Sequence, residues 1–268
     1  MKNIFLLAVL FIFILTSCKD DDFTYAFPEL SQHLVTVTAT TDDWEHQTKF
    51  VYDSLNRISE IQGIYADEQT YVESYTYNDV GKISQKVNES YTTNYVYNAA
   101  GQVIEENVSY VSPYDGDMSF TKTKYLYKNG KISKGIEYSE EGEVVSYISY
   151  KYDSRGNTLE KIVRSASSPD IILYEIRFRY DNKINPLGLY GISTLNGYVY
   201  SQNADIVQVN NPTYLSYLNS FASSLPPEFD ISYEYNSADL PETAIMDYVR
   251  YPEHEGIDVL FEYESVED

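Results

Sequence analysis

Hydrophobic and polar residues alternate along most of the chain from about residue 33 onward. The stretch LVTVTA at residues 34–39 shows this pattern. Similar segments rich in β-branched and aromatic residues follow it, separated by polar turns, as far as about residue 184. A period of two is typical of a strand with one buried face. The short, even spacing of the turns therefore predicts an all-β fold, an antiparallel meander of about 16 strands that is strongly curved or barrel-like.

A phrase with two tyrosines recurs in this region. It reads YTYNDVGKI at residues 75–83, and the other copies stand at residues 50–58, 95–103, 125–132, 136–144, 150–159 and 233–240. Residues i and i+2 of a strand share a face, so Tyr75 and Tyr77 should point the same way and pack across neighbouring strands. Asn78 is suited to open a turn, and Gly81 to supply the positive φ that a three-residue hairpin loop needs. Each copy therefore predicts one hairpin.

Two copies lack the glycine. Asn56 takes its place in the first copy and Asp239 in the last. Asparagine tolerates the left-handed conformation well, and we treat aspartate as the poorer substitute, so the last hairpin should be looser. The copy at 125–132 is one residue shorter and contains Asn129-Gly130, which predicts a tight two-residue turn.

The alternation is interrupted at residues 184–228, where we expect a loop and helix insertion. Asn211-Pro212 is typical of a helix start, and Pro226-Pro227 of a stop. Between them, Tyr214, Leu215, Leu218, Phe221, Ala222 and Leu225 recur at helical spacing. The pattern predicts one short amphipathic helix, from Pro212 to Leu225, lying against one face or one mouth of the curved sheet.

The N-terminus carries an export signal. Residues 4–15 form an unbroken apolar run after Lys2. Crossing a membrane as a helix takes about 20 such residues, so the run suits a secretory signal instead. It ends in Leu15-Thr16-Ser17-Cys18, which resembles the bacterial lipobox. That resemblance implies removal of residues 1–17 and acylation of Cys18, the one cysteine; the alternative is a free thiol beside a short buried helix.

The segment after the cysteine, Lys19-Asp20-Asp21-Asp22, resembles the acidic export tag of surface lipoproteins in some Gram-negative bacteria. A solvated tether is the simpler interpretation, and the two are compatible. We expect residues 18–32 to form a lipidated tether and residues 33–268 a single domain. The expected location is the outer membrane, lipid-anchored, with the cell surface favoured over the periplasmic leaflet.

The net charge of −22 narrows the range of partners. A chain this acidic repels phosphate backbones and anionic lipid surfaces, so we expect no nucleic-acid binding, and membrane attachment only through the lipid on Cys18. With Cys18 acylated no thiol remains for a disulfide, and the fold must depend on its own core. We expect a monomer.

The phrase Tyr-x-Tyr-Asp/Asn-x-x-Gly, followed by a basic or polar residue and Ile or Leu, resembles the YD repeat of Rhs and teneurin proteins. The match covers about residues 50–240. The lipobox, the acidic tag and the stretch Tyr180–Pro186 add a likeness to lipoproteins of gut-type Gram-negative bacteria. Those proteins have a porin-like, curved β fold and unknown function. The resemblance implies a fold and a location, and it carries over no catalytic residue.

Candidate chemistry is scarce. The three histidines show no spacing typical of a zinc site. Ser119-Phe120-Thr121-Lys122 matches Ser-x-x-Lys, but that chemistry needs a helix, and in a strand the two side chains would point to opposite faces. Asp115 and Asp117 suit a turn better than a calcium site. We therefore predict no enzyme activity, no metal and no cofactor.

The 29 tyrosines leave one functional hypothesis. Most serve as core residues of the repeats, whereas those outside the phrase and near loops are candidates for ligand binding: Tyr110, Tyr114, Tyr190, Tyr198 and Tyr200. Asp53-Ser54-Leu55 resembles an acceptor for O-glycosylation at Ser54. We predict a surface module that binds a glycan or a protein. The alternative is a carrier of a small apolar ligand in a cavity beneath the helix.

Overall fold

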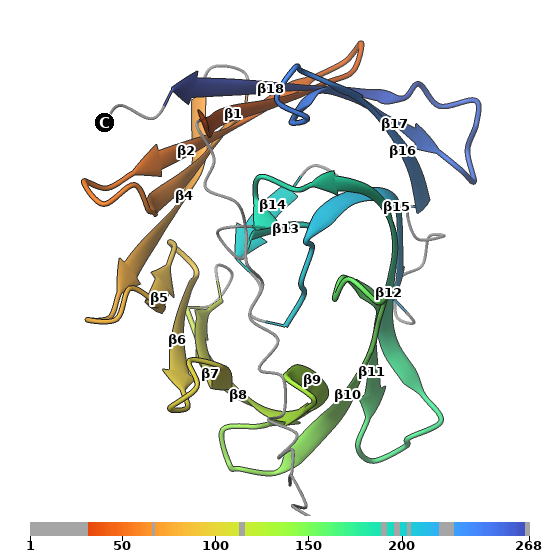
Figure 1. Ribbon diagram of the computed structural model, residues 1–268. Helices are drawn as coiled ribbons and strands as arrows, with labels where there is room; N and C mark the ends of the chain where they lie inside the picture. The colour runs from red at the N-terminus through yellow and green to blue at the C-terminus, as the bar shows by residue number, and fades with distance from the viewer. Residues whose placement is uncertain are drawn as a thin grey trace, which may run out of the picture.

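A computed structural model describes residues 32–65, 68–112, 116–188, 192–195, 199–202, 205–219 and 228–265. Sixteen strands in this part of the chain form one closed barrel, seen along its axis in Figure 1. Neighbouring strands are antiparallel throughout, and β18 pairs with β1 to close the ring. The predicted all-β fold of about 16 antiparallel strands is confirmed.

The strands follow one another in chain order around the barrel, except between β12 and β15, where β13 and β14 form a separate hairpin. Their bounds are β1 Gln32–Thr40, β2 Glu45–Tyr52, β3 Ile58–Tyr65, β4 Glu68–Tyr77, β5 Ile83–Val87, β6 Tyr91–Tyr97, β7 Val103–Val111, β8 Met118–Lys128, β9 Lys131–Tyr138, β10 Val144–Tyr152, β11 Thr158–Ser165, β12 Ile172–Ile184, β13 Ile192–Leu195, β14 Val199–Gln202, β15 Asn210–Asn219, β16 Glu228–Tyr235, β17 Pro241–Tyr248 and β18 Ile257–Ser265.

The repeated phrase forms hairpins as predicted. The backbone N–H groups of Val80 and Lys82 donate to the Asn78 side chain at 3.1 and 2.9 Å, and Gly81 has φ 76°. Asn56 and Asp239 occupy the same position with φ 57° and 61°. Asn129 and Gly130 both have positive φ, as a two-residue type I′ turn requires.

Most of these turns lie at the same end of the barrel, because every second turn of an antiparallel meander returns to one end. We call this the repeat end; it holds turns 53–57, 78–82, 98–102, 129–130, 153–157 and 236–240. β1 begins and β18 finishes at the repeat end. The opposite, distal end holds turns such as 88–90 and 139–143.

The predicted helix over Pro212–Leu225 is wrong for its described part. Residues 210–219 form strand β15, which pairs with β12 on one side and with β16 on the other. Leu215 and Tyr217 face the interior and Tyr214 and Ser216 the outside, so a period of two applies. Hydrogen bonds to strands on both sides stabilise the extended backbone here. Tyrosine has only a weak helix propensity, so the helical spacing of the apolar residues does not decide the structure. Residues 220–225 lie outside the described part.

One half of the interior is an apolar core. It is built on β1–β3 and β15–β18 and includes Phe50, Ile61, Phe229, Met246 and Phe261. The connection between β12 and β15 turns inward from the repeat end and contributes Leu187 and Ile206 to the same core. Figure 1 shows its hairpin, β13 and β14, inside the ring of strands. The connection therefore fills part of the lumen.

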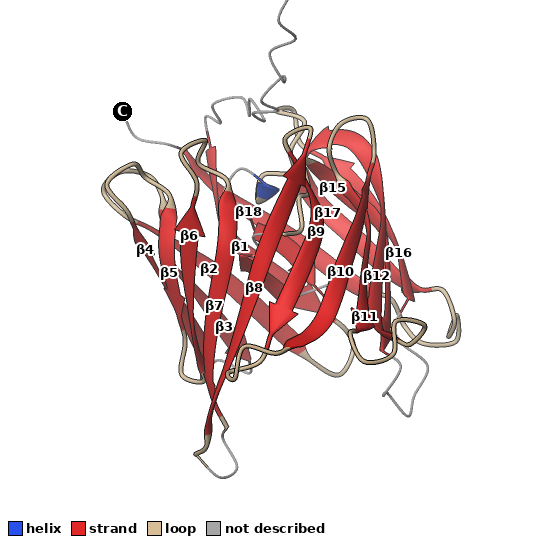
Figure 2. Ribbon diagram, turned by 90° about the horizontal axis from the view of Figure 1, so that it is seen from below, coloured by secondary structure: helices blue, strands red, loops and turns tan. Residues whose placement is uncertain are grey.

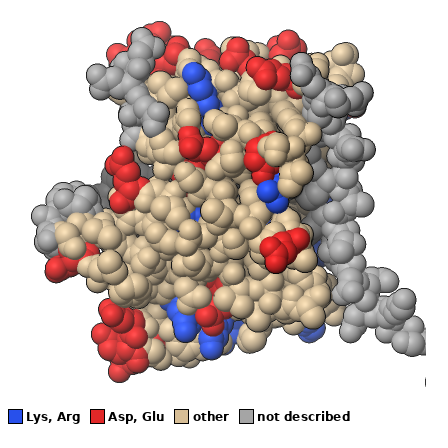
Figure 3. All heavy atoms as spheres, turned by 90° about the vertical axis from the view of Figure 1, so that its left-hand side faces the viewer, with Lys and Arg blue, Asp and Glu red and all other residues tan. Residues whose placement is uncertain are grey.

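The outer face of the wall carries a polar row over β4–β8. One row of paired residues crosses five strands from β4 to β8 and reads Thr76, Gln85, Asn94, Asn107 and Lys122. Figure 3 shows acidic and basic side chains spread over this side of the barrel, its middle included. A barrel that crosses a bilayer turns an apolar band outward, and a lysine at the midplane costs about 2–4 kcal/mol there. This part of the outer face is therefore suited to water.

Candidate functional site

A groove of about 690 Å³ lies on the outer face of β6–β9, near the distal end. It results from a step in the wall. Pairing between β8 and β9 ends at Lys122 and Tyr138, although β8 continues to Met118 on the distal side. Beyond Tyr138 the chain turns through residues 139–143, whose backbone bonds are internal to the turn. Figure 2 shows the β7–β8 hairpin projecting beyond its neighbours at this end.

The projecting hairpin carries an exposed apolar patch. Val111 and Met118 pair directly across the two strands, and Phe120 is on the same face as Met118. Their exposed fractions are 39%, 58% and 42%. Contiguous exposed apolar side chains usually mark an interaction site. We call these three residues the hairpin patch, and Phe120 also lines the groove.

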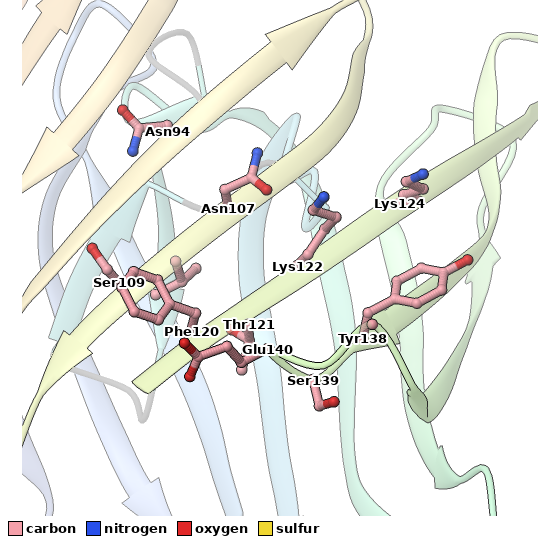
Figure 4. Close-up of a pocket in the computed structure, with 12 residues that line it drawn as sticks. Asn94, Asn107, Ser109, Phe120, Thr121, Lys122, Lys124, Tyr138, Ser139 and Glu140 are labelled. Carbon is pink, nitrogen blue, oxygen red and sulfur yellow. The ribbon is translucent and has the colours of Figure 1, made fainter. Parts of the chain in front are cut away.

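The groove floor is polar and carries charge of both signs. Lys122 and Lys124 share one carboxylate, that of Glu105, with each Nζ 3.9 Å from an oxygen. Contacts this long between exposed groups hold the two ammonium groups only loosely. The Lys124 ammonium also lies 5.7 Å from the centre of the Tyr138 ring. Figure 4 shows Glu140 on the same side of the groove as Phe120, with Lys124 and Tyr138 on the other.

The chemistry of the groove suits binding. Its described lining includes Asn94, Asn107 and Ser109, which offer hydrogen-bonding side chains, beside two aromatic rings and two cations. In the described residues, no group of three or more histidine, cysteine, aspartate or glutamate side chains is placed to hold a metal. An aromatic and amide-lined groove of this size can accept either an extended polypeptide or a short oligosaccharide.

The second polar centre is in the lumen, on β4–β6. Tyr75 and Tyr91 both donate hydrogen bonds to the Glu73 carboxylate. Lys86 Nζ lies 3.8 Å from the same carboxylate, and all but Tyr91 are buried. Burial raises the pKa of the Tyr75 hydroxyl well above its usual value, and the adjacent Glu73 charge raises it further. The tyrosine therefore remains a hydrogen-bond donor.

The lumen connection is fixed by a buried ion pair. Asp205 lies 2.6 Å from Lys161 Nζ on β11 and accepts a 2.7 Å hydrogen bond from Tyr150. Nearby, Tyr125 donates a 2.6 Å hydrogen bond to Glu106. Burial raises the pKa of Glu106, and the Asp205 charge raises it further. Breaking a buried pair by removing one partner costs about 3–5 kcal/mol, so this network holds the connection in place.

The described residues place only some of the predicted sites. Tyr110 lies on the inward face of β7 at the distal end, 40% exposed, and is separate from the groove. Tyr200 belongs to β14, but its side chain is outside the described part, as are Tyr114, Tyr190, Tyr198 and Cys18. Ser54 lies in an exposed turn. Ligand binding by these tyrosines, lipidation of Cys18 and glycosylation of Ser54 stay predictions.

Sequence reasoning missed the residues of the groove. Phe120 and Lys122 were considered only as part of Ser-x-x-Lys and set aside. The repeat phrase contains a signal that could have found them. Tyr125, the first tyrosine of its copy, faces inward and so fixes which residues of β8 face outward. Counting back along β8 in steps of two places Thr123, Thr121 and Ser119 on the inner face, and the residues between them, Phe120 and Met118 included, on the outer face. Large apolar residues on the water-facing side of a strand mark a surface that is covered in use.

Comparison with known proteins shows the fold. A porin-like protein from Bacteroides uniformis has a similar structure, with a TM-score of 0.51 and 14% sequence identity, covering 87% of this chain and 96% of that one. A second porin-like protein, from Bacteroides vulgatus, has a TM-score of 0.46 and 15% identity, covering 88% of this chain and 100% of that one. No family model and no curated protein matches the sequence. The fold is therefore that of a porin-like β-barrel.

Proposed function

We propose that this protein is a non-enzymatic binding module, anchored to the outer membrane by lipid on Cys18, whose barrel stands in water at the cell surface and binds a partner protein. The polar row across the outer face of β4–β8 supports this position, since a barrel that crosses a bilayer turns an apolar band outward. In the described residues, no helix has the length and apolarity to cross a membrane. Attachment then depends on the acyl chains, of which two or three hold firmly.

The direction of the strands supports an orientation of the barrel relative to the membrane, with the repeat end toward it. The first described residue, Gln32, is at the repeat end, so the predicted tether joins the barrel there. An anchor at Cys18 would turn the repeat end toward the membrane. The projecting β7–β8 hairpin and its groove are at the distal end, directed away from the anchor. A partner outside the cell would then meet the groove first.

The hairpin patch is the observation that carries the proposal. Val111, Met118 and Phe120 are apolar, exposed and contiguous, beside a groove of about 690 Å³. Aromatic residues and methionine are enriched in protein interfaces, whereas an oligosaccharide would leave Val111 and Met118 without a partner. A protein partner therefore uses more of this surface than a glycan does.

The carrier hypothesis has less support. Its lid was the helix at Pro212–Leu225, and the described part of that segment is instead strand β15 in the barrel wall. The apolar half of the lumen is occupied by side chains of the β12–β15 connection, Leu187 and Ile206 among them. The space in which an apolar ligand was expected is used by the protein's own core.

The test is photo-crosslinking in intact cells that make the protein. A benzoylphenylalanine at position 120 should crosslink to the partner. Because the partner is a protein, protease treatment should remove the crosslinked adduct. The same probe at position 126, where Leu126 is 51% exposed on the same strand, is the matched control. Met118→Ser should lower the yield from position 120 and leave the yield from 126 unchanged. Equal yields from both positions, or adducts that only a glycan-degrading enzyme removes, would contradict the proposal.

A further inference from the structure

We infer that the groove receives an extended, positively charged segment of the partner protein, which adds to the free edge of β8 as an extra strand. This inference rests on the proposed function and specifies the partner's chemistry and its mode of binding. It follows from three features of the distal end: an unpaired strand edge, side chains that leave the edge unprotected, and carboxylates along its open side.

The edge is that of residues 118–121. On one side these residues pair with β7, residue by residue, from Val111–Met118 to Val108–Thr121. On the other side the register with β9 starts only at Lys122, opposite Tyr138. In an antiparallel strand every second residue directs both its N–H and its C=O to the same side. About two of these four residues therefore present backbone donors and acceptors to the groove.

Natural edge strands are usually protected by lysine, proline, a bulge or a covering loop. The free stretch reads Met118-Ser119-Phe120-Thr121 and contains neither lysine nor proline. Its register with β7 shows no bulge. β7, by contrast, is covered on its other side, where Val111 N–H donates a 2.7 Å hydrogen bond to the Ser90 carbonyl. Within the β7–β8 hairpin, the unprotected edge is therefore that of β8, at the groove.

The surroundings select the chemistry of the added strand. Alternate apolar residues would pack on Met118 and Phe120, whose exposed fractions are 58% and 42%. The turn beside the edge carries Glu140, Glu141 and Glu143, and Glu140 lines the groove. The two lysines that also line it, Lys122 and Lys124, are both paired with Glu105. The whole chain carries −22, which attracts a cationic segment and repels an anionic one. The partner segment should thus alternate apolar and basic residues.

Synthetic peptides provide the test. The probe is a fluorescein-labelled nonapeptide of alternating valine and lysine, mixed with the full-length protein in detergent and followed by fluorescence anisotropy. N-methylation of one alternate set of backbone N–H groups should weaken binding about tenfold, the effect of two lost hydrogen bonds. N-methylation of the other set, which points away from β8, should change it little. A valine–glutamate peptide should bind more weakly than the valine–lysine peptide.

Two protein variants separate the contributions. Glu140→Gln with Glu141→Gln should weaken the valine–lysine peptide and reduce the salt dependence of its binding. Leu126→Ser, on the same strand but outside the groove, should leave both unchanged. Equal binding of the two N-methylated peptides would overturn strand addition, and preference for the glutamate peptide would overturn the cationic partner. No peptide binding, with crosslinking from position 120 intact, would overturn this inference and leave the proposed function standing.

Discussion

The hydroxyl of Tyr77 donates a 2.6 Å hydrogen bond to the carbonyl oxygen of Ile58. Tyr77 is the second tyrosine of one phrase, and Ile58 is the residue that ends the preceding copy and begins the next strand. The contact thus joins a repeat to the one before it. The same bond recurs at 2.7–2.8 Å in five other places: Tyr52 to Leu34, Tyr97 to Ile83, Tyr127 to Val103, Tyr180 to Thr158 and Tyr263 to Pro241.

Removing this hydroxyl should loosen the barrel. Tyr77→Phe deletes the donor to Ile58 and keeps the ring, so the free energy of unfolding should fall by about 1 kcal/mol. Tyr110→Phe is the control, since Tyr110 is 40% exposed and lies near the rim. Urea denaturation of the two purified variants measures the difference. An equal effect of both substitutions would show that the Tyr77 bond adds nothing specific.

The hairpins were predictable from sequence because turn chemistry is local. Asn78 bonds the backbone within the same turn, and Gly81 supplies a φ that few other residues adopt, so neither depends on distant residues. That Tyr75 and Tyr77 share one face also follows from a period of two. Their partners were not predictable. The bond from Tyr77 to Ile58 joins the neighbouring strands β4 and β3, and sequence alone does not fix the offset between them.

The turn glycine should matter through its backbone angle alone. Gly81 has φ 76°, and a Cβ added there would meet nothing within 4 Å. Gly81→Ala should therefore cost about 1 kcal/mol from the left-handed conformation, without any clash. Asn56→Gly, at the equivalent position with φ 57°, should instead stabilise the protein by a few tenths of a kcal/mol.

Thermal unfolding of these two variants, side by side, checks the sign. A lower midpoint for Gly81→Ala and a higher one for Asn56→Gly is the expected pair of results. Destabilisation by both substitutions would mean that side-chain contacts of Asn56, and not its φ, set the stability of the first hairpin.

The errors and omissions of the sequence reasoning share one physical origin. Residues 212–219 have helical spacing, but closing the barrel requires a strand there, and β12 and β16 supply its hydrogen bonds. The groove depends on β8 extending past β9, which is a matter of strand offset. The burial of Asp205 against Lys161 depends on a connection that turns inward. Each feature is set by contacts between residues far apart in sequence.

The buried carboxyl of Glu106 should make stability depend on pH. Burial raises its pKa in the folded protein above that of the unfolded chain. Between the two pKa values the folded state holds a proton that the unfolded state has released, so stability falls as pH rises through this window. Above the window the ionised group is a continuing cost.

Glu106→Gln should remove that cost, because an amide oxygen still accepts the hydrogen bond from Tyr125 and carries no charge. The variant should be more stable than the parent protein at neutral pH, and the difference should shrink toward acid. Urea denaturation from pH 4 to pH 8 measures both curves. Glu105→Gln, on the outer face of the same strand, is the control. A stability gap that does not change with pH would contradict the assignment to Glu106.

Anchoring by Cys18 is the prediction on which the orientation of the groove depends. Cys18→Ala removes the only thiol that can be acylated, so the protein should lose fatty-acid labelling and leave the membrane fraction. Ser17→Ala keeps a small residue before the cysteine and should be labelled normally. Metabolic labelling with an alkyne-tagged fatty acid, followed by membrane fractionation, tests both variants. If the Cys18→Ala protein stays in the membrane unlabelled, another contact holds the barrel, and the groove would have no defined direction relative to the anchor.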